Sequence, residues 1–319
     1  MAGRPFCYRA RMSPAPANTL LTSSDLEGVY VPVITPFGDD DAIDESSLTA
    51  ILEFQLAAGV RGIVAMGTTG EYYAMSVAER LQAMQHIAIT VGDRAQLIAG
   101  CNAGSTREVI ALAVAAQELG YQAIMLAAPY TSLPTQRELA GHYLAVARAT
   151  DLPIILYNYP ARAGVEIGFE CLDAVADDSQ IIAIKESSGD FSRFLALKQR
   201  YEGRVAVMCG SDDQAADYFF WGVRSWLAGT ANVLPQHHVN IMNRANEGQY
   251  SKAQCLFAGI LPWIQNMESG SYNAKAKAGL AHQGFTVGKV RQPLLPLPQS
   301  TLTETLAMLD LALSSGSEA

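Results

Sequence analysis

The sequence is short of charge, and of positive charge above all. Charged residues make up 17% of its 319 residues, and 22 lysines and arginines stand against 31 aspartates and glutamates, so the net charge is −9. An acidic protein of this kind lacks the basic surface that binding to nucleic acid or to anionic membranes requires. An anionic substrate is still compatible with this balance, because a pocket can be locally positive inside an acidic protein.

Cysteine is also scarce, and its spacing is informative. The five cysteines are odd in number and widely scattered, and none forms a Cys-x-x-Cys pair. This pattern argues against a disulfide framework and against a zinc site, and it favours a reducing cytoplasm. The histidines include the neighbours His237 and His238 but no pair at helical metal spacing. We therefore expect no metal and no separate cofactor.

No apolar run in the sequence approaches the length of a membrane span, although half of the residues are apolar. Residues 1–25 contain Arg4, Arg9 and Arg11, but prolines and polar residues interrupt any signal-peptide core. We interpret these residues as a poorly ordered tail. The apolar residues that follow are numerous enough to bury a sizeable core.

From residue 28 onward, short apolar runs alternate with segments of helical periodicity. The expected strands are residues 28–34, 62–66, 96–100, 123–126, 153–157, 181–185, 205–209 and 225–228. The expected helices are residues 44–58, 76–91, 105–119, 135–149, 169–176, 190–200, 212–221 and one that begins near Pro235. Eight such units predict a closed (β/α)₈ TIM barrel, and the alternative is an open doubly wound sheet. The barrel is favoured because no glycine-rich dinucleotide fingerprint follows the first strand.

The alternation stops near residue 249. Residues 251–265, 272–282 and 302–313 read as helices, with a proline-rich connection before the last of them. We therefore expect a barrel domain over residues 26–248 and a C-terminal helical extension over residues 249–319.

The run Ile181-Ile182-Ala183-Ile184-Lys185 is the stretch with the clearest chemistry. A lysine at the C-terminal mouth of a buried strand is partly desolvated, which favours its neutral, nucleophilic amine. Such an amine forms a Schiff base with a ketone. The alternative is a lysine that only closes its strand and extends to water.

Other polar residues follow neighbouring strands, where barrel active sites lie. Gly67-Thr68-Thr69-Gly70-Glu71 follows the second strand and is suited to holding a carboxylate, or is only a capped turn. Tyr157 ends the strand before that of Lys185, where a phenol can relay protons or simply close the barrel. Arg162 comes five residues later and can bind a carboxylate with two hydrogen bonds, or remain solvated.

Taken together, these motifs resemble those of the dihydrodipicolinate synthase / N-acetylneuraminate lyase family of class I lyases. The resemblance runs from about Gly28 to Leu297. It rests on six motifs in order: GTTGE at 67–71, YNYPARAG at 157–164, IKESSGD at 184–190, GSDD at 210–213, GTANV at 229–233 and GKVRQPLLPL near the C-terminus.

The resemblance implies a role for each matching residue. Lys185 would form the imine with pyruvate or another 2-oxo acid, with no cofactor beyond this covalent bond. Tyr157 and Thr69 would relay protons, while Thr68 and Thr69 would hold the 2-oxo acid carboxylate. Arg162 would hold the carboxylate of an aldehyde partner. A homotetramer built as a dimer of dimers is also implied.

The resemblance also implies that Gly210 lines the floor of the pocket. Two departures from the synthase pattern bear on the second substrate. Thr131 stands where synthases carry a tyrosine that completes the proton relay across a subunit interface, and Tyr72-Tyr73 replaces small residues. The nearest activity is 4-hydroxy-tetrahydrodipicolinate synthase, which joins pyruvate to aspartate semialdehyde. The alternatives are an aldolase or dehydratase of a 2-oxo-3-deoxy sugar acid and, more distantly, a barrel that only binds a 2-oxo acid.

Overall fold

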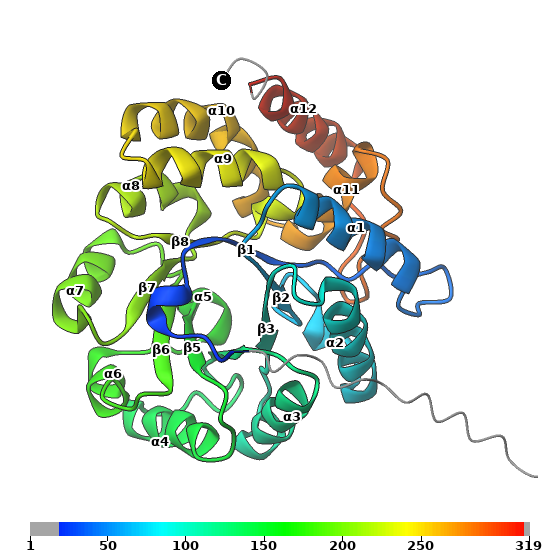
Figure 1. The fold of residues 1–319 in the computed structure, drawn as a ribbon. Coiled ribbons are helices and arrows are strands. Elements are labelled where there is room, and N and C mark those ends of the chain that lie inside the picture. Colours follow the sequence, from blue (N-terminus) through cyan, green and yellow to red (C-terminus); the bar gives the residue numbers. More distant parts are fainter. Residues whose placement is uncertain (1–18, 316–319) are drawn as a thin grey trace, which may run out of the picture.

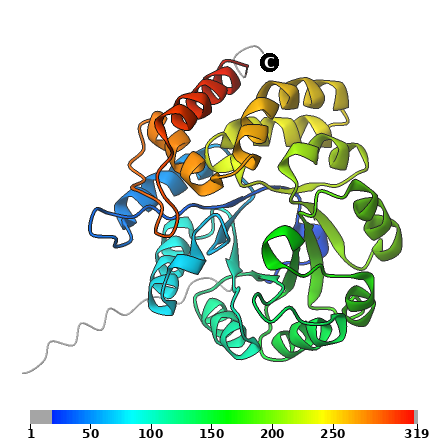
Figure 2. The same cartoon turned by 180° about the vertical axis from the view of Figure 1, so that it is seen from behind.

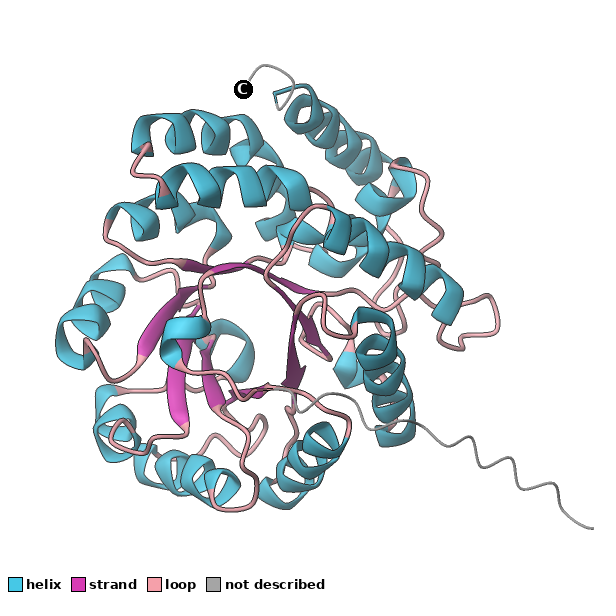
Figure 3. Ribbon diagram, viewed as in Figure 1, coloured by secondary structure: helices cyan, strands magenta, loops and turns pink. Residues whose placement is uncertain are grey.

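The computed structural model describes residues 19–315 and shows a closed barrel of parallel strands surrounded by helices (Figures 1 and 3). Each strand pairs with the next along the chain, and β8 pairs with β1 to close the barrel. The predicted (β/α)₈ fold is confirmed. The strands are β1 (Gly28–Pro32), β2 (Gly62–Ala65), β3 (Gln96–Gly100), β4 (Ala123–Ala127), β5 (Ile154–Asn158), β6 (Ile181–Glu186), β7 (Ala206–Cys209) and β8 (Ser225–Leu227).

The barrel helices begin where side chains cap their first turns. Asp44, Ser76, Ser105, Thr135 and Asp190 each accept a hydrogen bond from an amide of the following helix. The helices are α1 (Glu45–Ala57), α2 (Val77–Val91), α3 (Thr106–Glu118), α4 (Gln136–Ala147), α6 (Phe169–Val175), α7 (Phe191–Tyr201), α8 (Ala215–Phe220) and α9 (Pro235–Asn246).

Short helical turns occur at the strand–helix connections, and the sequence did not predict them. They are η2 (Tyr72–Ala74), α5 (Pro160–Ala163), η3 (Asp212–Gln214) and η4 (Thr230–Asn232). The segment expected to be one helix over residues 212–221 is thus divided into η3 and α8. The division has a local reason, since the Asp212 side chain turns inward to bond with Trp226 and Thr230.

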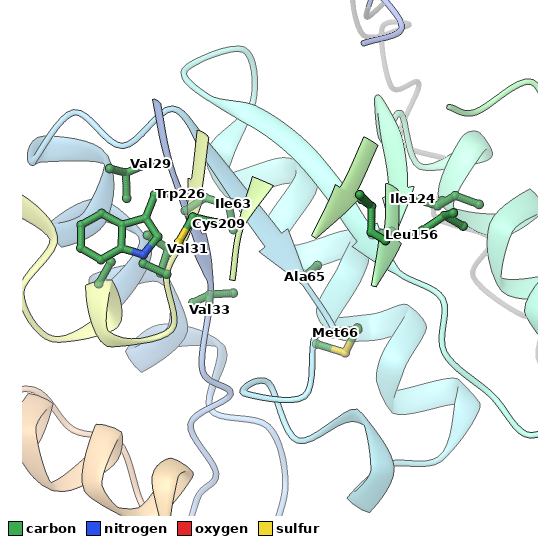
Figure 4. Packing of buried hydrophobic residues seen from close by; sticks show 14 of the residues in the cluster. Val29, Val31, Val33, Ile63, Ala65, Met66, Ile124, Leu156, Cys209 and Trp226 are labelled. Atoms are coloured by element: carbon green, nitrogen blue, oxygen red, sulfur yellow. The ribbon is translucent and has the colours of Figure 1, made fainter. Parts of the chain in front are cut away.

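Alternation along each strand divides the core into two layers. One set of side chains fills the barrel interior and includes Tyr30, Met125, Ala183 and Leu227. The other set packs outward against the helices; Figure 4 shows part of it, with Val29, Val31, Ile63 and Trp226 among the labelled side chains. Burial on both faces explains why the strand sequences are continuously apolar.

One end of the barrel is closed by residues 19–27, which precede β1. Leu21 and Leu26 are buried against the interior set, and a short turn, η1 (Ser23–Asp25), lies between them. Figure 1 looks onto this end, and Figure 2 looks onto the opposite end, where the green helix α5 lies across the opening. Residues 1–18 of the expected tail lie outside the described residues, whereas its last seven residues, 19–25, belong to the fold.

Three further helices follow the barrel: α10 (Tyr250–Glu268), α11 (Tyr272–His282) and α12 (Gln299–Ser315). They lie together on one side of the barrel, and α12 packs against both α10 and α11 (Figure 1). A C-terminal helical extension is therefore present as expected, while the division of the chain into domains at residue 249 stays a prediction. The end of α10 and the start of α11 reach the open end of the barrel.

Candidate active site

Lys185 and Tyr157 lie side by side where two neighbouring strands end. The register of β5 and β6 places Tyr157 opposite Lys185, and Lys185 Nζ is 4.2 Å from the centre of the Tyr157 ring. Both residues are buried, with 7% and 6% of their surface exposed. Within residues 19–315, neither the lysine nitrogen nor the phenol oxygen has a hydrogen-bond or ion-pair partner. Both groups are therefore free to engage a ligand.

The two side chains face a cavity of about 320 Å³ at the open end of the barrel. This cavity brings together all but one of the residues that the sequence singled out: Thr68, Thr69, Tyr157, Arg162, Lys185 and Gly210. A larger cavity of about 900 Å³ lies at the opposite end, around Asp25 and Arg61. That end carries none of the strand C-termini, where barrel chemistry is performed, so the smaller cavity is the candidate active site.

Gly210 is required by the position of Lys185. A Cβ atom at residue 210 would lie 2.7 Å from Lys185 Cε and 2.1 Å from Ser187 Oγ, closer than atoms in proteins approach. The Gly210 amide bonds to Glu186 O at 2.9 Å, which fixes the loop after β7 against the end of β6. The glycine therefore makes room for the lysine side chain to extend into the cavity.

The Gly67–Glu71 loop forms another wall and is held from outside the cavity. Glu71 is fully buried, and its carboxylate pairs with Lys277 Nζ at 2.7 Å and accepts the Arg291 amide at 2.9 Å. Thr69 faces the cavity and makes no hydrogen bond within residues 19–315. Its amide and hydroxyl are thus available for a carboxylate.

Arg162 stands at the rim, on the short helix α5. Its guanidinium lies 5.1 Å from the centre of the Tyr159 ring and 6.0 Å from that of Tyr272. Contacts of this kind orient the planar guanidinium, whose N–H groups lie in its plane. Arg162 is placed to hold an anionic group that enters above Lys185.

The structure adds four residues to the site that sequence analysis did not assign: Asp212, Asp213, Glu268 and Tyr272. Burial in the cavity wall and, to a smaller extent, the neighbouring aspartates raise the pKa of Glu268 to about 7. The GSDD motif was a usable signal for the two aspartates. Glu268 and Tyr272 had none, because they come from the end of α10 and the start of α11.

Thr131 is the predicted site residue that the fold leaves outside. It is exposed, has a backbone φ of 75°, and does not line the cavity. Its neighbour Tyr130 lines an adjoining cavity of about 520 Å³ together with Tyr72 and Tyr73. This second cavity shares Tyr157 and Arg162 with the first, so the tyrosines form an approach to the site.

Within residues 19–315, no group of three or more histidine, cysteine, aspartate or glutamate side chains could hold a metal ion. In that same part of the chain, no helix is both long and apolar enough to span a membrane.

Comparison with known proteins gives one consistent family. The model of the dihydrodipicolinate synthetase family matches residues 25–312. A 4-hydroxy-tetrahydrodipicolinate synthase of Sorangium cellulosum is 34% identical over 278 residues, which cover 86% of this chain and 92% of the relative. The enzyme of that name from Methanocaldococcus jannaschii is 31% identical over 274 residues, covering 86% and 94%.

Comparison with solved structures leads to the same family. The 4-hydroxy-tetrahydrodipicolinate synthase of Methylacidiphilum fumariolicum superposes with a TM-score of 0.87 at 29% identity, covering 91% of this chain and 96% of that one. A chloride-inhibited dihydrodipicolinate synthase of Acinetobacter baumannii, solved with pyruvate, gives a TM-score of 0.86 at 33% identity, covering 90% and 99%.

Proposed function

The chain belongs to the dihydrodipicolinate synthetase family and is a lyase, and from this premise we propose that Lys185 forms an imine with pyruvate or another 2-oxo acid. The observation that carries the proposal is the unpaired Lys185 amine beside the Tyr157 phenol in the barrel cavity. The amine attacks the ketone carbon, the phenol returns a proton to the departing oxygen, and water leaves. Loss of a proton from the methyl carbon then gives an enamine.

The enamine carbon adds to the aldehyde of a second substrate, for which we propose aspartate semialdehyde. Thr68 and Thr69 hold the 2-oxo acid carboxylate, and Arg162 holds the carboxylate of the aldehyde. Gly210 forms the floor beneath the imine. The relay proceeds through Tyr157 and Thr69, and any part for Thr131 requires contact with another copy of the chain.

Trapping with borohydride tests the imine directly. Pyruvate with borohydride should add a stable reduced adduct to the peptide that contains Lys185, because hydride reduces the carbon–nitrogen double bond. Lys185→Ala should lose both labelling and turnover. Lys198→Ala is a useful comparison, since Lys198 lies on α7 outside the cavity, where its amine pairs with Glu202 at 3.5 Å. Labelling that survives in the Lys185 variant would move the imine to another lysine.

A second candidate is an aldolase or dehydratase of 2-oxo-3-deoxy sugar acids. The observation in its favour is the wall formed by Asp213, Glu268 and Tyr272, whose oxygens can bond to substrate hydroxyls. An assay of pyruvate with aspartate semialdehyde, run beside a panel of deoxy sugar acids, separates the two activities.

We further propose a homotetramer in the cytoplasm. Cys101, Cys171, Cys209 and Cys255 are free thiols, which agrees with a reducing compartment. Sedimentation of the purified protein would test the oligomeric state.

A further inference from the structure

Asp212 forms part of the cavity wall at the start of η3 and is almost fully buried, at 2% exposed. Its Oδ1 accepts the Trp226 indole N–H at 2.9 Å. Its Oδ2 lies 3.1 Å from the Thr230 amide, 2.8 Å from Thr230 Oγ1 and 3.3 Å from the Tyr272 hydroxyl. The carboxyl group thus links the cavity-lining Tyr272 to a threonine in the interior.

The chain of hydrogen bonds continues inward from Thr230. Thr230 Oγ1 lies 2.8 Å from His238 Nε2, and His238 Nδ1 lies 2.7 Å from the carbonyl oxygen of Leu234. Thr230 and His238 are completely buried. The chain therefore ends on a carbonyl oxygen, which can only accept.

Counting hydrogens shows that this chain holds one more proton than its ordinary protonation states supply. The three links, Leu234 O to His238, His238 to Thr230, and Thr230 to Asp212, need three hydrogens. A neutral histidine brings one, a threonine hydroxyl one, and an ionised aspartate none. The third hydrogen must sit on either Asp212 or His238.

Burial decides where that proton sits. Removal from water disfavours the charged form of each group, so it raises the pKa of Asp212 and lowers the pKa of His238 to about 3. The favoured state is therefore a neutral His238 that donates from Nδ1 and a protonated Asp212 that donates to Thr230.

Tyr272 connects this chain to the substrate. Its ring lies over Gly229, where a Cβ atom would come within 2.2 Å of the Tyr272 hydroxyl oxygen, so glycine is needed at that position. Tyr272 and Gly229 line the same cavity as Lys185. Burial keeps the pKa of Tyr272 well above its ordinary value, so the phenol stays protonated and can donate.

We propose that Asp212, Thr230 and His238 store one proton and that Tyr272 passes it to the carbonyl oxygen of the aldehyde while the new carbon–carbon bond forms. The inference deepens the proposed function and rests on its Lys185 enamine. It supplies the site with a proton donor from its own chain, separate from Tyr157. The other titratable or charged groups around the chain are Lys185, Arg162, Asp213 and Glu268 in the cavity, Cys209 in the interior and the half-buried His237.

The step balances as follows. The enamine carbon forms a bond to the aldehyde carbon, and its nitrogen pair forms the iminium on Lys185. The carbonyl π electrons move to oxygen, which takes the proton from the Tyr272 hydroxyl. The phenol oxygen takes the proton from Asp212 Oδ2, and Thr230 turns its own hydroxyl hydrogen from His238 to the carboxylate that remains. Solvent protonates that carboxylate after the product leaves, and the Thr230 hydrogen returns to His238. Cleavage of an aldol reverses each movement.

The stored proton can be measured without any substrate. Difference infrared spectra of the wild type and Asp212→Asn should assign a protonated carboxylic acid at neutral pH to Asp212, and nitrogen-labelled histidine should report His238 as the neutral Nδ1–H form. A cationic His238 with an ionised Asp212 would also supply the third hydrogen, and it would support the proposal that these residues store one proton. An ionised Asp212 with a neutral His238 would overturn the proposal.

Activity tests the delivery of the proton. Tyr272→Phe keeps the ring over Gly229 and removes only the hydroxyl, so borohydride trapping with pyruvate should stay within about twofold of wild type. Turnover of pyruvate with aspartate semialdehyde should fall by about a hundredfold or more, the usual contribution of a general acid. Thr230→Val, which interrupts the chain, should lower the same turnover and change its pH profile.

Tyr201→Phe is the matched control, because the Tyr201 hydroxyl also bonds to an aspartate, Asp173, at 2.8 Å, but on the outer side of the barrel. It should retain turnover. Wild-type turnover in Tyr272→Phe would overturn the proposal, as would an equal loss of trapping and turnover, which indicates a structural role. A wild type that traps no pyruvate would instead refute the proposed function. If the wild type traps pyruvate but does not react with aspartate semialdehyde, the infrared measurement decides whether Asp212, Thr230 and His238 store a proton.

Discussion

At the rim of the cavity, single side chains of opposite charge face one another. Arg162 presents a guanidinium above Lys185, whereas Glu268 and Asp213 present carboxylates on the wall formed with the C-terminal helices. A substrate that meets both kinds of group would carry an anionic group at one point and hydroxyl or ammonium donors at another. We therefore expect these few residues to set the selectivity of the site, and Lys185 to set the type of reaction.

Arg162→Ala should weaken the reaction with the aldehyde substrate and leave imine formation with pyruvate unchanged. A charge-assisted pair of hydrogen bonds is worth about 1.5–3 kcal/mol, which corresponds to a loss of roughly tenfold to a hundredfold in kcat/KM for the aldehyde. Borohydride trapping with pyruvate alone should barely change. Steady-state kinetics of both substrates measures this, and a parallel fall in trapping would show that Arg162 supports the pyruvate site instead.

Glu268 should make stability depend on pH near neutrality. Its pKa in the folded protein, about 7, lies above its ordinary value of 4.5, so the folded state holds a proton that the unfolded state has lost. The stabilisation is complete below the lower pKa and is lost as the pH rises through the higher one. Urea unfolding between about pH 5 and pH 8 should show wild type losing stability relative to Glu268→Gln. Glu304→Gln, on the exposed face of α12, should show no such trend.

At the scale of elements, the C-terminal helices do more than cover the barrel. Helix α11 supplies Lys277, which pairs with Glu71 beneath the threonine loop, and the segment after it supplies Arg291. The Arg291 guanidinium also bonds to the Ala74 carbonyl at 2.8 Å and pairs with Glu79. The extension thereby holds the loop that is expected to bind the 2-oxo acid carboxylate.

Lys277→Met should destabilise the protein by about 3–5 kcal/mol, because it leaves the buried Glu71 carboxylate without its partner. Adding Glu71→Gln in the same chain removes that charge and should recover part of the loss. Urea unfolding of the two single variants and the double variant measures the coupling. Strictly additive losses would show that the pair contributes little.

At the scale of the whole molecule, the closed barrel leaves no sheet edge, so any assembly must use helix and loop surfaces. Two separate groups of exposed apolar side chains are present. One surrounds the approach to the cavity and comprises Tyr73, Tyr130, Leu294 and Leu295; the other lies on α8 and α10 and comprises Phe220, Trp221 and Tyr250. A dimer of dimers needs two different self-complementary surfaces, and these two groups are suited to that requirement.

Replacing both Phe220 and Trp221 by glutamate should therefore reduce the proposed tetramer to a dimer. These residues are 67% and 47% exposed, so the change costs the isolated chain little packing. Sedimentation velocity measures the mass. Ile89→Glu is the control, since Ile89 is 64% exposed on α2, outside both groups. An unchanged mass in the double variant would remove this surface from the assembly.

Periodicity along the chain was enough to predict the barrel, because burial on both faces makes a parallel strand continuously apolar and each helix needs its own cap and apolar stripe. The same reasoning predicted that Lys185 and Tyr157 would be neighbours, since consecutive strands of a barrel end at the same rim. The six predicted residues that line the cavity, from Thr68 to Gly210, all lie at the C-terminal ends of strands or in the loops that follow them.

Contacts between distant segments were decided only by the tertiary structure. Glu268 and Tyr272 reach the cavity because α10 and α11 pack against the barrel. No local sequence pattern predicts that packing. The shared proton of Asp212, Thr230 and His238 depends on three loops or helices meeting within hydrogen-bond distance. Thr131 follows β4, as the prediction requires, yet it does not line the cavity of its own chain. Local sequence determines secondary structure through propensity and burial, whereas the polar lining of a site also depends on how separate elements pack.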